Sequence, residues 1–247
     1  LASDDRRVWQ PAAAVVRELK SADAAAALAK VVPALPDDRL PAVIQSCANS
    51  GNSAFASALT GLFASADSGV RASAMEAVAR LDVGSQLSTL LAAAARDDDA
   101  GKAALKALME TPADVATPLL KIMGGLSAAE QPVALSLLGS RGDRAALPSL
   151  LKSALDPADD KIGRIAADAV ARIGGQGEYV ALIKAVASTE SLRARLIPAL
   201  RTFGPRAPDA DAAANAVAAA MSAGLPAREG CMLLGSLKSP AAGMKLL

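Results

Sequence analysis

Short runs of apolar residues at helical spacing recur along the chain, with polar turns between them. In the stretch 161–187 the apolar positions fit the i, i+4, i+5, i+8 spacing of one helical face: Ile165, Ala169, Val170 and Ile173. The glycine pair at 174–175 ends this run, and a second apolar run follows. Strand-like alternation bounded by turns appears nowhere in the sequence. The pattern therefore predicts an all-α protein.

The same pattern returns at intervals of roughly 30 residues. The segment DAVARI at 168–173 has a close copy, EAVARL, at 76–81. Matched apolar positions follow in steps of 30, 30, 32 and 30 residues: Val78, Leu108, Leu138, Val170 and Leu200. A unit of this size cannot bury its apolar face alone, so neighbouring units stack and share a core. We expect an α-solenoid of stacked antiparallel helix pairs, with roughly seven units.

Each unit divides into two helices. Residues 143–157 predict a first helix, which Asp156 and Pro157 end because the residue before a proline avoids helical geometry. Residues 159–175 predict a second helix, with Asp159 or Asp160 as its N-cap. Similar polar turns separate the predicted helices at 65–70, 96–101 and 222–227.

These features suggest one array over residues 1–247. Within it, 1–37 would form irregular N-terminal helices and 38–204 the regular repeats. The turn is longer after residue 204, so 205–247 would form a last, weaker repeat beyond a linker.

The stretch 143–188 resembles the short bacterial HEAT repeats that also occur in phycobilisome lyases. It has their order of first helix, charged turn, second helix and next first helix, and the resemblance extends over about 38–239. Pro118 and Pro148 stand where members of this family often carry a proline early in the first helix. The resemblance implies an α-solenoid whose second helices, called B helices below, line a concave surface where partners bind.

Composition narrows the function classes. The chain is 52% hydrophobic but only 2% aromatic, which suits closely packed helices rich in alanine. A net charge of +1 argues against a nucleic-acid partner, which would require a basic stripe. The sequence has no histidine, which excludes Ser-His and Cys-His nucleophile pairs and His-containing metal sites. No apolar run is long enough to span a membrane.

Charged residues on the predicted B helices are the candidate partner-binding residues: Arg164, Asp168, Arg172, Arg193 and Arg201. The alternative for Asp168 and Arg172 is an i, i+4 ion pair that only stabilises the helix. Lys106 and Glu110 occupy the matching positions with reversed signs, which favours a solvated face.

The most basic stretch of the chain surrounds two of these candidates. Arg193 and Arg201 share a predicted helical face and could hold an acidic peptide or a phosphate. Arg195 and Arg206 lie near them in the sequence, while nearby acidic residues partly compensate the charge: Glu190, Asp209 and Asp211.

Two further groups have structural interpretations. The run 97–99 of three aspartates could bind a divalent cation, but it directly precedes a predicted helix, where capping is the favoured role. Cys47 and Cys231 are expected to be small buried thiols, too far apart in sequence for a disulfide framework.

The sequence therefore predicts a non-catalytic scaffold without cofactor or metal, which binds a protein or peptide on its concave B-helix face. The alternative is a bilin-lyase-like or other HEAT-fold enzyme accessory. Iron-dependent HEAT hydroxylases require His ligands, and HEAT-like glycosylases require a basic groove with aromatic residues, neither of which this sequence provides. The expected setting is a bacterial, soluble protein, with a secreted or periplasmic location open.

Overall fold

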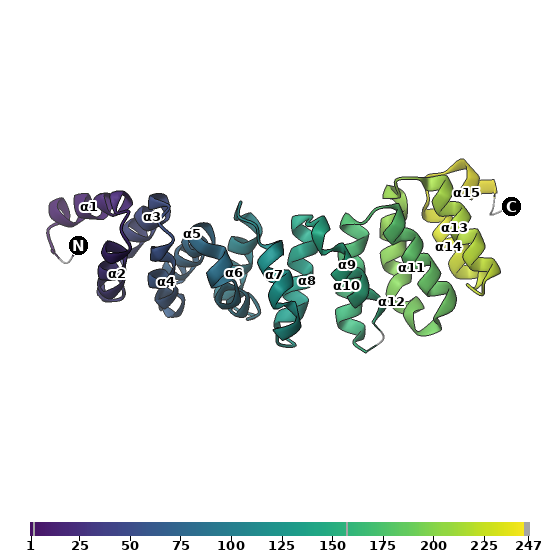
Figure 1. The fold of residues 1–247 in the computed structure, drawn as a ribbon, viewed down its shortest axis with the longest axis horizontal. Coiled ribbons are helices and arrows are strands. Elements are labelled where there is room, and N and C mark those ends of the chain that lie inside the picture. Colours follow the sequence, from purple (N-terminus) through teal and green to yellow (C-terminus); the bar gives the residue numbers. More distant parts are fainter. Residues whose placement is uncertain (2, 157, 245–247) are drawn as a thin grey trace. The chain divides into compact units, whose positions relative to one another are not determined.

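The computed structural model describes residues 1, 3–156 and 158–244, and every regular element within them is helical (Figure 1). This confirms the all-α prediction. Contacts divide the chain into two compact units, Leu1–Val133 and Ala134–Leu247, which we call unit 1 and unit 2. The finer division at residues 37 and 204 stays a prediction.

The α-helices of unit 1 run from the purple N-terminal end to the teal middle of Figure 1: α1 (Arg6–Val15), α2 (Ala22–Val31), α3 (Leu40–Ser50), α4 (Ala54–Thr60), α5 (Ser68–Ala94), α6 (Asp99–Glu110) and α7 (Ala116–Ile122). Short 3-10 helices extend several of them: η1 (Val16–Glu18), η2 (Val32–Ala34), η3 (Gly61–Ala64) and η4 (Met123–Gly125).

Helix α8 (Glu130–Arg141) begins in unit 1 and ends in unit 2. Unit 2 continues with α9 (Leu147–Leu155), α10 (Asp160–Ile173), α11 (Gln176–Ser188), α12 (Arg193–Phe203), α13 (Ala210–Ser222), α14 (Ala227–Ser236) and α15 (Pro240–Met244). Its 3-10 helices are η5 (Arg144–Ala146), η6 (Glu190–Leu192) and η7 (Gly204–Arg206).

Helix α5 is two helices in one. Asp82 has φ −159° and ψ 69°, so the helical path is interrupted there. Its carboxylate accepts a hydrogen bond from the backbone N–H of Ser85 at 3.0 Å and so caps the second part. The sequence gives no clear signal for this break, because neither glycine nor proline occupies position 82.

Aspartate caps start the helices where the sequence places them. In four helices an aspartate side chain accepts from a backbone N–H three residues ahead, at 2.7–2.9 Å: Asp67, Asp98, Asp159 and Asp209. The N-cap of α10 is thus Asp159, one of the two predicted residues. Asp98 performs the capping role predicted for the aspartate run. Hydrogen bonds from the Gly101 N–H and the Arg96 side chain lower the pKa of Asp98.

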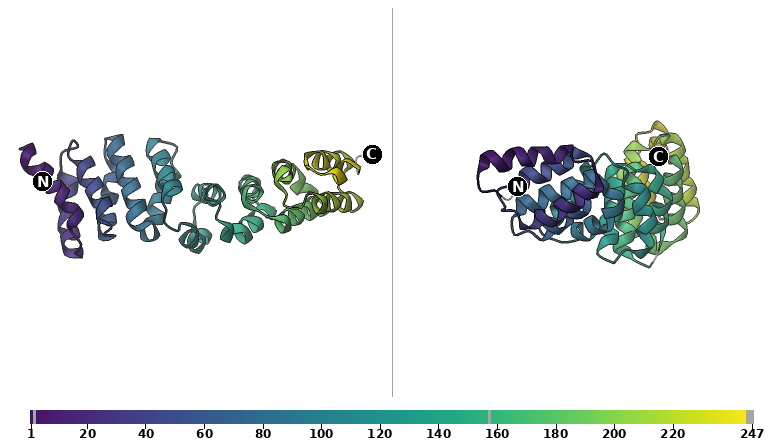
Figure 2. Two further views of the ribbon diagram at one scale, coloured as in Figure 1. Left: turned by 90° about the horizontal axis from the view of Figure 1, so that it is seen from above. Right: turned by 60° about the vertical axis from the view of Figure 1, so that its left-hand side comes forward.

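Within each unit, helices pack against close neighbours in the sequence, as the further views of Figure 2 illustrate. In unit 1, α3 and α4 pack on α5, and α5 packs on α6. In unit 2, α10, α12 and α14 contact one another in that order, and so do α9, α11 and α13. The cores are mainly aliphatic. The edge-on contact of Tyr179 with Phe203, with ring centroids 5.3 Å apart, is an aromatic exception in unit 2.

Small residues allow helices to approach closely, as the alanine-rich composition suggests. Gly139 of α8 faces Ala169 of α10, and a Cβ at position 139 would lie 2.6 Å from the Ala169 Cβ. No real side chain tolerates that distance, so α8 and α10 require a glycine there.

Arginine side chains tie turns to distant parts of the same unit. The carbonyl acceptors include the Leu1 oxygen for Arg39, the Val186 and Gly224 oxygens for Arg193, and the Ala171 and Arg172 oxygens for Arg206. Except for that of Leu1, these carbonyls lie at or just beyond helix ends, where intrahelical partners are missing, so the guanidinium groups satisfy acceptors that would otherwise require water.

The two cysteines differ in environment. Cys47 of α3 is fully buried, as predicted, whereas Cys231 of α14 is exposed, so the prediction for Cys231 was wrong. The reason is the register of α14: Gly230, Leu233 and Leu234 form its buried side, and Cys231 falls outside that stripe.

Candidate partner-binding surface

Three of the predicted residues line the solvent side of α10. Arg164, Asp168 and Arg172 follow one another at i, i+4 and i+8, and all three are exposed. Gly163, Ala166 and Val170 are among the residues that form the opposite, buried side. The helical periodicity thus places these charges as expected, pointing away from the core of unit 2.

The ion pairs on α10 differ from the expected arrangement. The guanidinium of Arg164 pairs with Asp160, with Nη2 and Oδ2 2.7 Å apart, and Arg172 donates to the Ser140 hydroxyl of α8 at 3.0 Å. The i, i+4 pair between Asp168 and Arg172 is not formed. Within the described residues, Asp168 has no ion-pair partner closer than 4.0 Å. Asp168 is therefore an unpaired carboxylate on an exposed helix face.

Arg193 and Arg201 have different roles although they belong to the same helix. Arg193 is half-buried, and its Nε and Nη2 donate to the Val186 and Gly224 carbonyls at 3.0 and 3.1 Å. These bonds fasten the end of α11 to the turn before α14. Arg201 is exposed, and in the described part of the chain it has no hydrogen-bond or ion-pair partner. Only Arg201 remains available for a partner, because Arg193 uses donors to hold the fold.

Arg195 is a structural residue that the sequence analysis counted only as part of the basic stretch. It is 4% exposed, and its Nη1 donates to the carbonyls of Ala154 and Asp156. Its Nε pairs with Asp160 at 3.3 Å. A charge can be buried when it is paired and hydrogen-bonded in this way. Because its carbonyl partners are 41 and 39 residues away in the sequence, no local pattern predicts that Arg195 is buried.

A groove of about 510 Å³ separates α12 from α14 in unit 2. Ala194 and Pro198 line it from α12, and both are exposed. Because Arg201 is three residues beyond Pro198 and seven beyond Ala194, it lies on the same helical face, one turn from the groove. The unpaired Arg201 is thus next to a concave site, which the sequence analysis did not anticipate.

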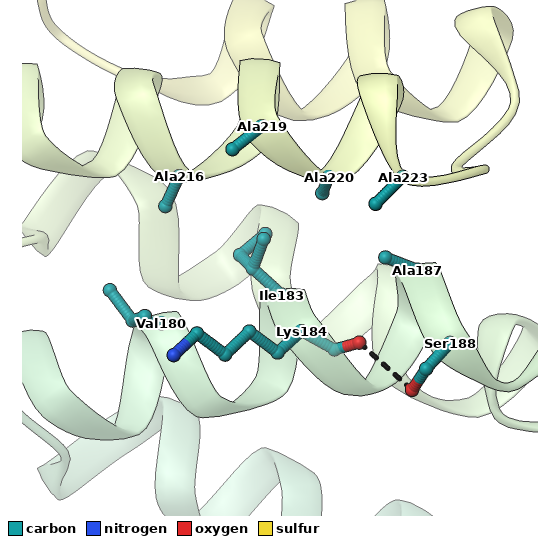
Figure 3. A pocket seen from close by; sticks show the side chains of 9 residues that line it. All are labelled: Val180, Ile183, Lys184, Ala187, Ser188, Ala216, Ala219, Ala220 and Ala223. Carbon is teal, nitrogen blue, oxygen red and sulfur yellow. Dashed lines mark hydrogen bonds between the residues drawn. The ribbon is translucent and has the colours of Figure 1, made fainter.

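A second groove, of about 320 Å³, lies between α11 and α13 (Figure 3). Its walls are mostly apolar and small: Val180, Ile183, Ala187, Ala216, Ala219, Ala220 and Ala223. Lys184 extends along it, and the hydroxyl of Ser188 donates back to the Lys184 carbonyl at 3.1 Å. The Ser188 hydroxyl is thus used within its own helix. The Lys184 ammonium is the one charged group that lines this groove in the described part of the chain.

Unit 1 carries a comparable set of exposed charges on α5 and α6. Glu76 lines two small hollows, one of about 150 Å³ toward α3 and one of about 70 Å³ toward α6. Arg80 borders the first hollow, whereas Lys106 and Glu110 border the second. Lys106 and Glu110 form an exposed ion pair 4.0 Å long, which contributes about 0–1 kcal/mol.

Neither a metal centre nor a membrane span is evident in the residues that the structure describes. Nowhere among them do three or more Cys, Asp or Glu side chains come together in a way that could hold a metal ion. None of the helices there combines the length and the apolar character needed to cross a bilayer. In the aspartate run, Asp98 caps α6 and Asp99 pairs with Lys102 at 3.3 Å.

The chain matches no protein-family model, and no curated protein is significantly similar to it.

Proposed function

We propose that the chain is an array of short HEAT-like repeats that acts as a non-catalytic scaffold for protein–protein interaction. A protein or peptide partner would bind along the B helices. The proposed B helices are α3, the first part of α5, α6, α8, α10, α12 and α14.

The repeat part of the proposal is supported by where these helices begin. They start at Leu40, Ser68, Asp99, Glu130, Asp160, Arg193 and Ala227, at intervals of 28, 31, 31, 30, 33 and 34 residues. One further helix or helix segment lies between each consecutive pair. Such regular alternation is typical of helix-pair repeats.

The binding part of the proposal rests on one observation in unit 2. Three successive proposed B helices, α10, α12 and α14, pack side by side. They carry two exposed charges without partners in the described structure, Asp168 on α10 and Arg201 on α12, and Arg201 lies one turn from the groove between α12 and α14. Unpaired charges beside a concave site suit a surface that a partner covers, because the partner can complete both the ion pairs and the packing.

Charge reversal at this surface tests the proposal. The test variant carries Arg164→Glu, Asp168→Lys, Arg172→Glu and Arg201→Glu, and leaves Arg193 unchanged because Arg193 holds the fold. The matched control carries Lys121→Glu and Lys152→Glu, two exposed lysines outside the proposed B helices, which give the same change in net charge.

A partner identified by affinity capture from native lysate would be purified and titrated against both variants at low salt. We expect the test variant to lose most of its affinity and the control to keep it. Equal affinity for the test variant and the native chain would contradict the proposed surface. A stoichiometric tetrapyrrole complex formed by the native chain in an absorbance titration would instead favour the bilin-lyase-like alternative.

A further inference from the structure

The groove between α11 and α13 has two apolar walls, and each wall is one face of a helix. The apolar lining residues recur at the helical spacing i, i+3 or i+4, i+7: Val180, Ile183 and Ala187 on α11, and Ala216, Ala219, Ala220 and Ala223 on α13. Alanine carries a single methyl group, so α13 fills little of the space between the helices, and a volume of about 320 Å³ remains. A concave site of this size with a mainly apolar lining is typical of small-molecule binding.

A single cation belongs to this groove. Lys184 is exposed, and in the described part of the chain its ammonium has no ion-pair partner within 4.0 Å. Figure 3 shows its side chain lying along the groove in the direction of Val180. This direction is expected, because side chains on a helix point back toward the N-terminus. The ammonium is thus near one end of the groove, whereas the lining residues at the other end, Ala187 and Ala223, are apolar.

The acidic side chains of the two helices do not offset this charge. Glu178 on α11 and Asp211 on α13 do not line the groove. The Glu178 carboxylate accepts a hydrogen bond from the Gly175 N–H at 2.7 Å, and the Asp211 carboxylate accepts one from the Ser239 hydroxyl. Charge complementarity therefore favours an occupant that brings one negative charge to Lys184.

The rest of the occupant should be an alkyl chain. The lining side chains offer no hydrogen-bonding group besides the Lys184 ammonium and the Ser188 hydroxyl, which is used within α11. An extended peptide would turn unpaired backbone N–H and C=O groups toward these walls. A helix satisfies its own backbone, but at about 10 Å across it is too wide to enter a groove of this volume. An alkyl chain needs no partners and is stabilised in proportion to the apolar area that it buries.

The length and the charge of the groove narrow the ligand further. Val180 and Ala187 are seven residues apart, as are Ala216 and Ala223, so each wall extends for about 10 Å along its helix. An extended eight-carbon acid is about as long. A phosphate head carries a charge of about −1.5 to −2, which one ammonium does not balance, whereas a carboxylate carries a single charge.

We infer that this groove binds a single-chain aliphatic carboxylate of medium length. The carboxylate pairs with the Lys184 ammonium, and the chain lies between Ile183 and the alanines of α13. Because α11 and α13 are not among the proposed B helices, the inference goes beyond the proposed function and does not depend on it.

Octanoate tests the groove directly. It would be titrated into the full chain labelled with ¹³C at the isoleucine δ1 methyl groups. Ile183 lines the groove, and its signal is assigned with Ile183→Leu. Octan-1-ol is the control for charge, because it has the same chain with a neutral head. Acetate is the control for the chain, because it has the same head.

We expect a saturable shift of the Ile183 signal with octanoate, and at least tenfold weaker binding of octan-1-ol and of acetate. Lys184→Met keeps an unbranched side chain and removes the charge. It should weaken octanoate binding at least tenfold and leave octan-1-ol binding unchanged. Lys152→Met, which removes another exposed lysine of unit 2 outside the groove, is the matched control and should bind octanoate as the native chain does.

A second variant fills the groove. Ala219 is exposed and lines the groove, so the larger side chain of Ala219→Leu occupies the ligand's place without entering the core. It should abolish the binding of both octanoate and octan-1-ol. Asn215→Leu adds the same side chain to another exposed position of α13 and should leave binding unchanged. Circular dichroism of each variant checks the helical fold independently of binding.

Three results would overturn the inference: no shift of the Ile183 signal, octan-1-ol binding as tight as octanoate binding, or unchanged octanoate binding by Lys184→Met. A helical peptide with leucine and glutamate four residues apart supplies a fourth. If it displaces octanoate and binds at least tenfold more tightly, the groove receives a protein segment instead. The charge-reversal variant leaves the residues of this groove unaltered, so either proposal can fail while the other stands.

Discussion

The guanidinium of Arg195 lies directly over Gly163, so closely that a Cβ at position 163 would come within 2.1 Å of Nη1. One helix, α12, thus inserts a charged side chain into the turn between two others, α9 and α10, and α10 makes room for it with a glycine. The arrangement accounts for a buried arginine in a unit whose core is mainly aliphatic.

Substitution of this glycine should destabilise unit 2. In Gly163→Ala, the new methyl group displaces Arg195 and strains its bonds to Ala154, Asp156 and Asp160, at a cost of about 1–3 kcal/mol. Gly177→Ala is the matched control, because Gly177 is also helical but has no neighbour within 4 Å. It should be neutral or stabilising by up to about 1 kcal/mol, since alanine favours a helix. Chemical denaturation measures both changes, and a loss of equal size in the two variants would contradict the close contact.

Removal of the Arg195 side chain should cost more than removal of Arg201 from the same helix. Arg195→Ala leaves two turn carbonyls without their donor, which we expect to lower the free energy of unfolding by about 1–3 kcal/mol. Arg201→Ala removes an exposed side chain and should change it by no more than about 0.5 kcal/mol. Denaturant midpoints distinguish the two, and an indistinguishable pair would show that the buried bonds of Arg195 contribute nothing.

The two thiols should differ sharply in reactivity. Cys231 is exposed and should react with a disulfide reagent in the folded protein, whereas Cys47 should react only after unfolding. Desolvation raises the pKa of the Cys47 thiol from 9.0 to about 12, which further suppresses its thiolate. Counting the thiols that react before and after addition of denaturant checks this. Two rapidly reacting thiols in the native state would be inconsistent with the burial of Cys47.

The same burial predicts a dependence of stability on alkaline pH. Because the folded state raises the pKa of Cys47, its contribution to stability is complete below about pH 9 and is lost as the pH rises toward 12. Cys47→Ala should therefore show a shallower decline in unfolding free energy between these values than the native chain. Cys231→Ala is the control and should retain the native slope.

The capping aspartate of α6 should contribute to stability in a pH-dependent manner. Asp98→Ala should lower the melting temperature, and Asp97→Ala, one residue earlier and also exposed, should not. The pKa of Asp98 is lowered in the fold, so its stabilisation is present above the ordinary carboxyl pKa of 3.8 and disappears as the pH falls through the lower folded value. Melting curves from neutral to strongly acidic pH should therefore converge for Asp98→Ala and the native chain. A constant difference would mean that the ionised cap is not the cause.

Local chemistry explains which parts of the fold could be predicted. Asp159 is the N-cap of α10 and Gly174 its C-cap. Each acts on the backbone of neighbouring residues, so a short stretch of sequence is enough to predict where the helix begins and ends. The exposure of Arg164, Asp168, Arg172 and Arg201 follows from helical periodicity for the same reason.

The remaining features depend on contacts that no local window contains. Arg193, Arg195 and Arg201 look alike in sequence, yet only the positions of distant carbonyls decide that the first two hold the fold. The exposure of Cys231 depends on which side of α14 meets its neighbours. The groove between α12 and α14 likewise becomes apparent only when the two helices are placed together.

The hydrogen bonds from arginine side chains to distant backbone carbonyls also affect the order in which the chain can fold during synthesis. Arg39, Arg195 and Arg206 follow the carbonyls of Leu1, Asp156 and Arg172 by 38, 39 and 34 residues. A ribosome releases each carbonyl first and its arginine only after roughly another helix pair has been made. Each of these carbonyls must therefore remain in water until the following segment emerges with its arginine. Nascent chains stalled just before residue 195 should accordingly leave the turn between α9 and α10 accessible to protease, and chains stalled well beyond it should protect that turn.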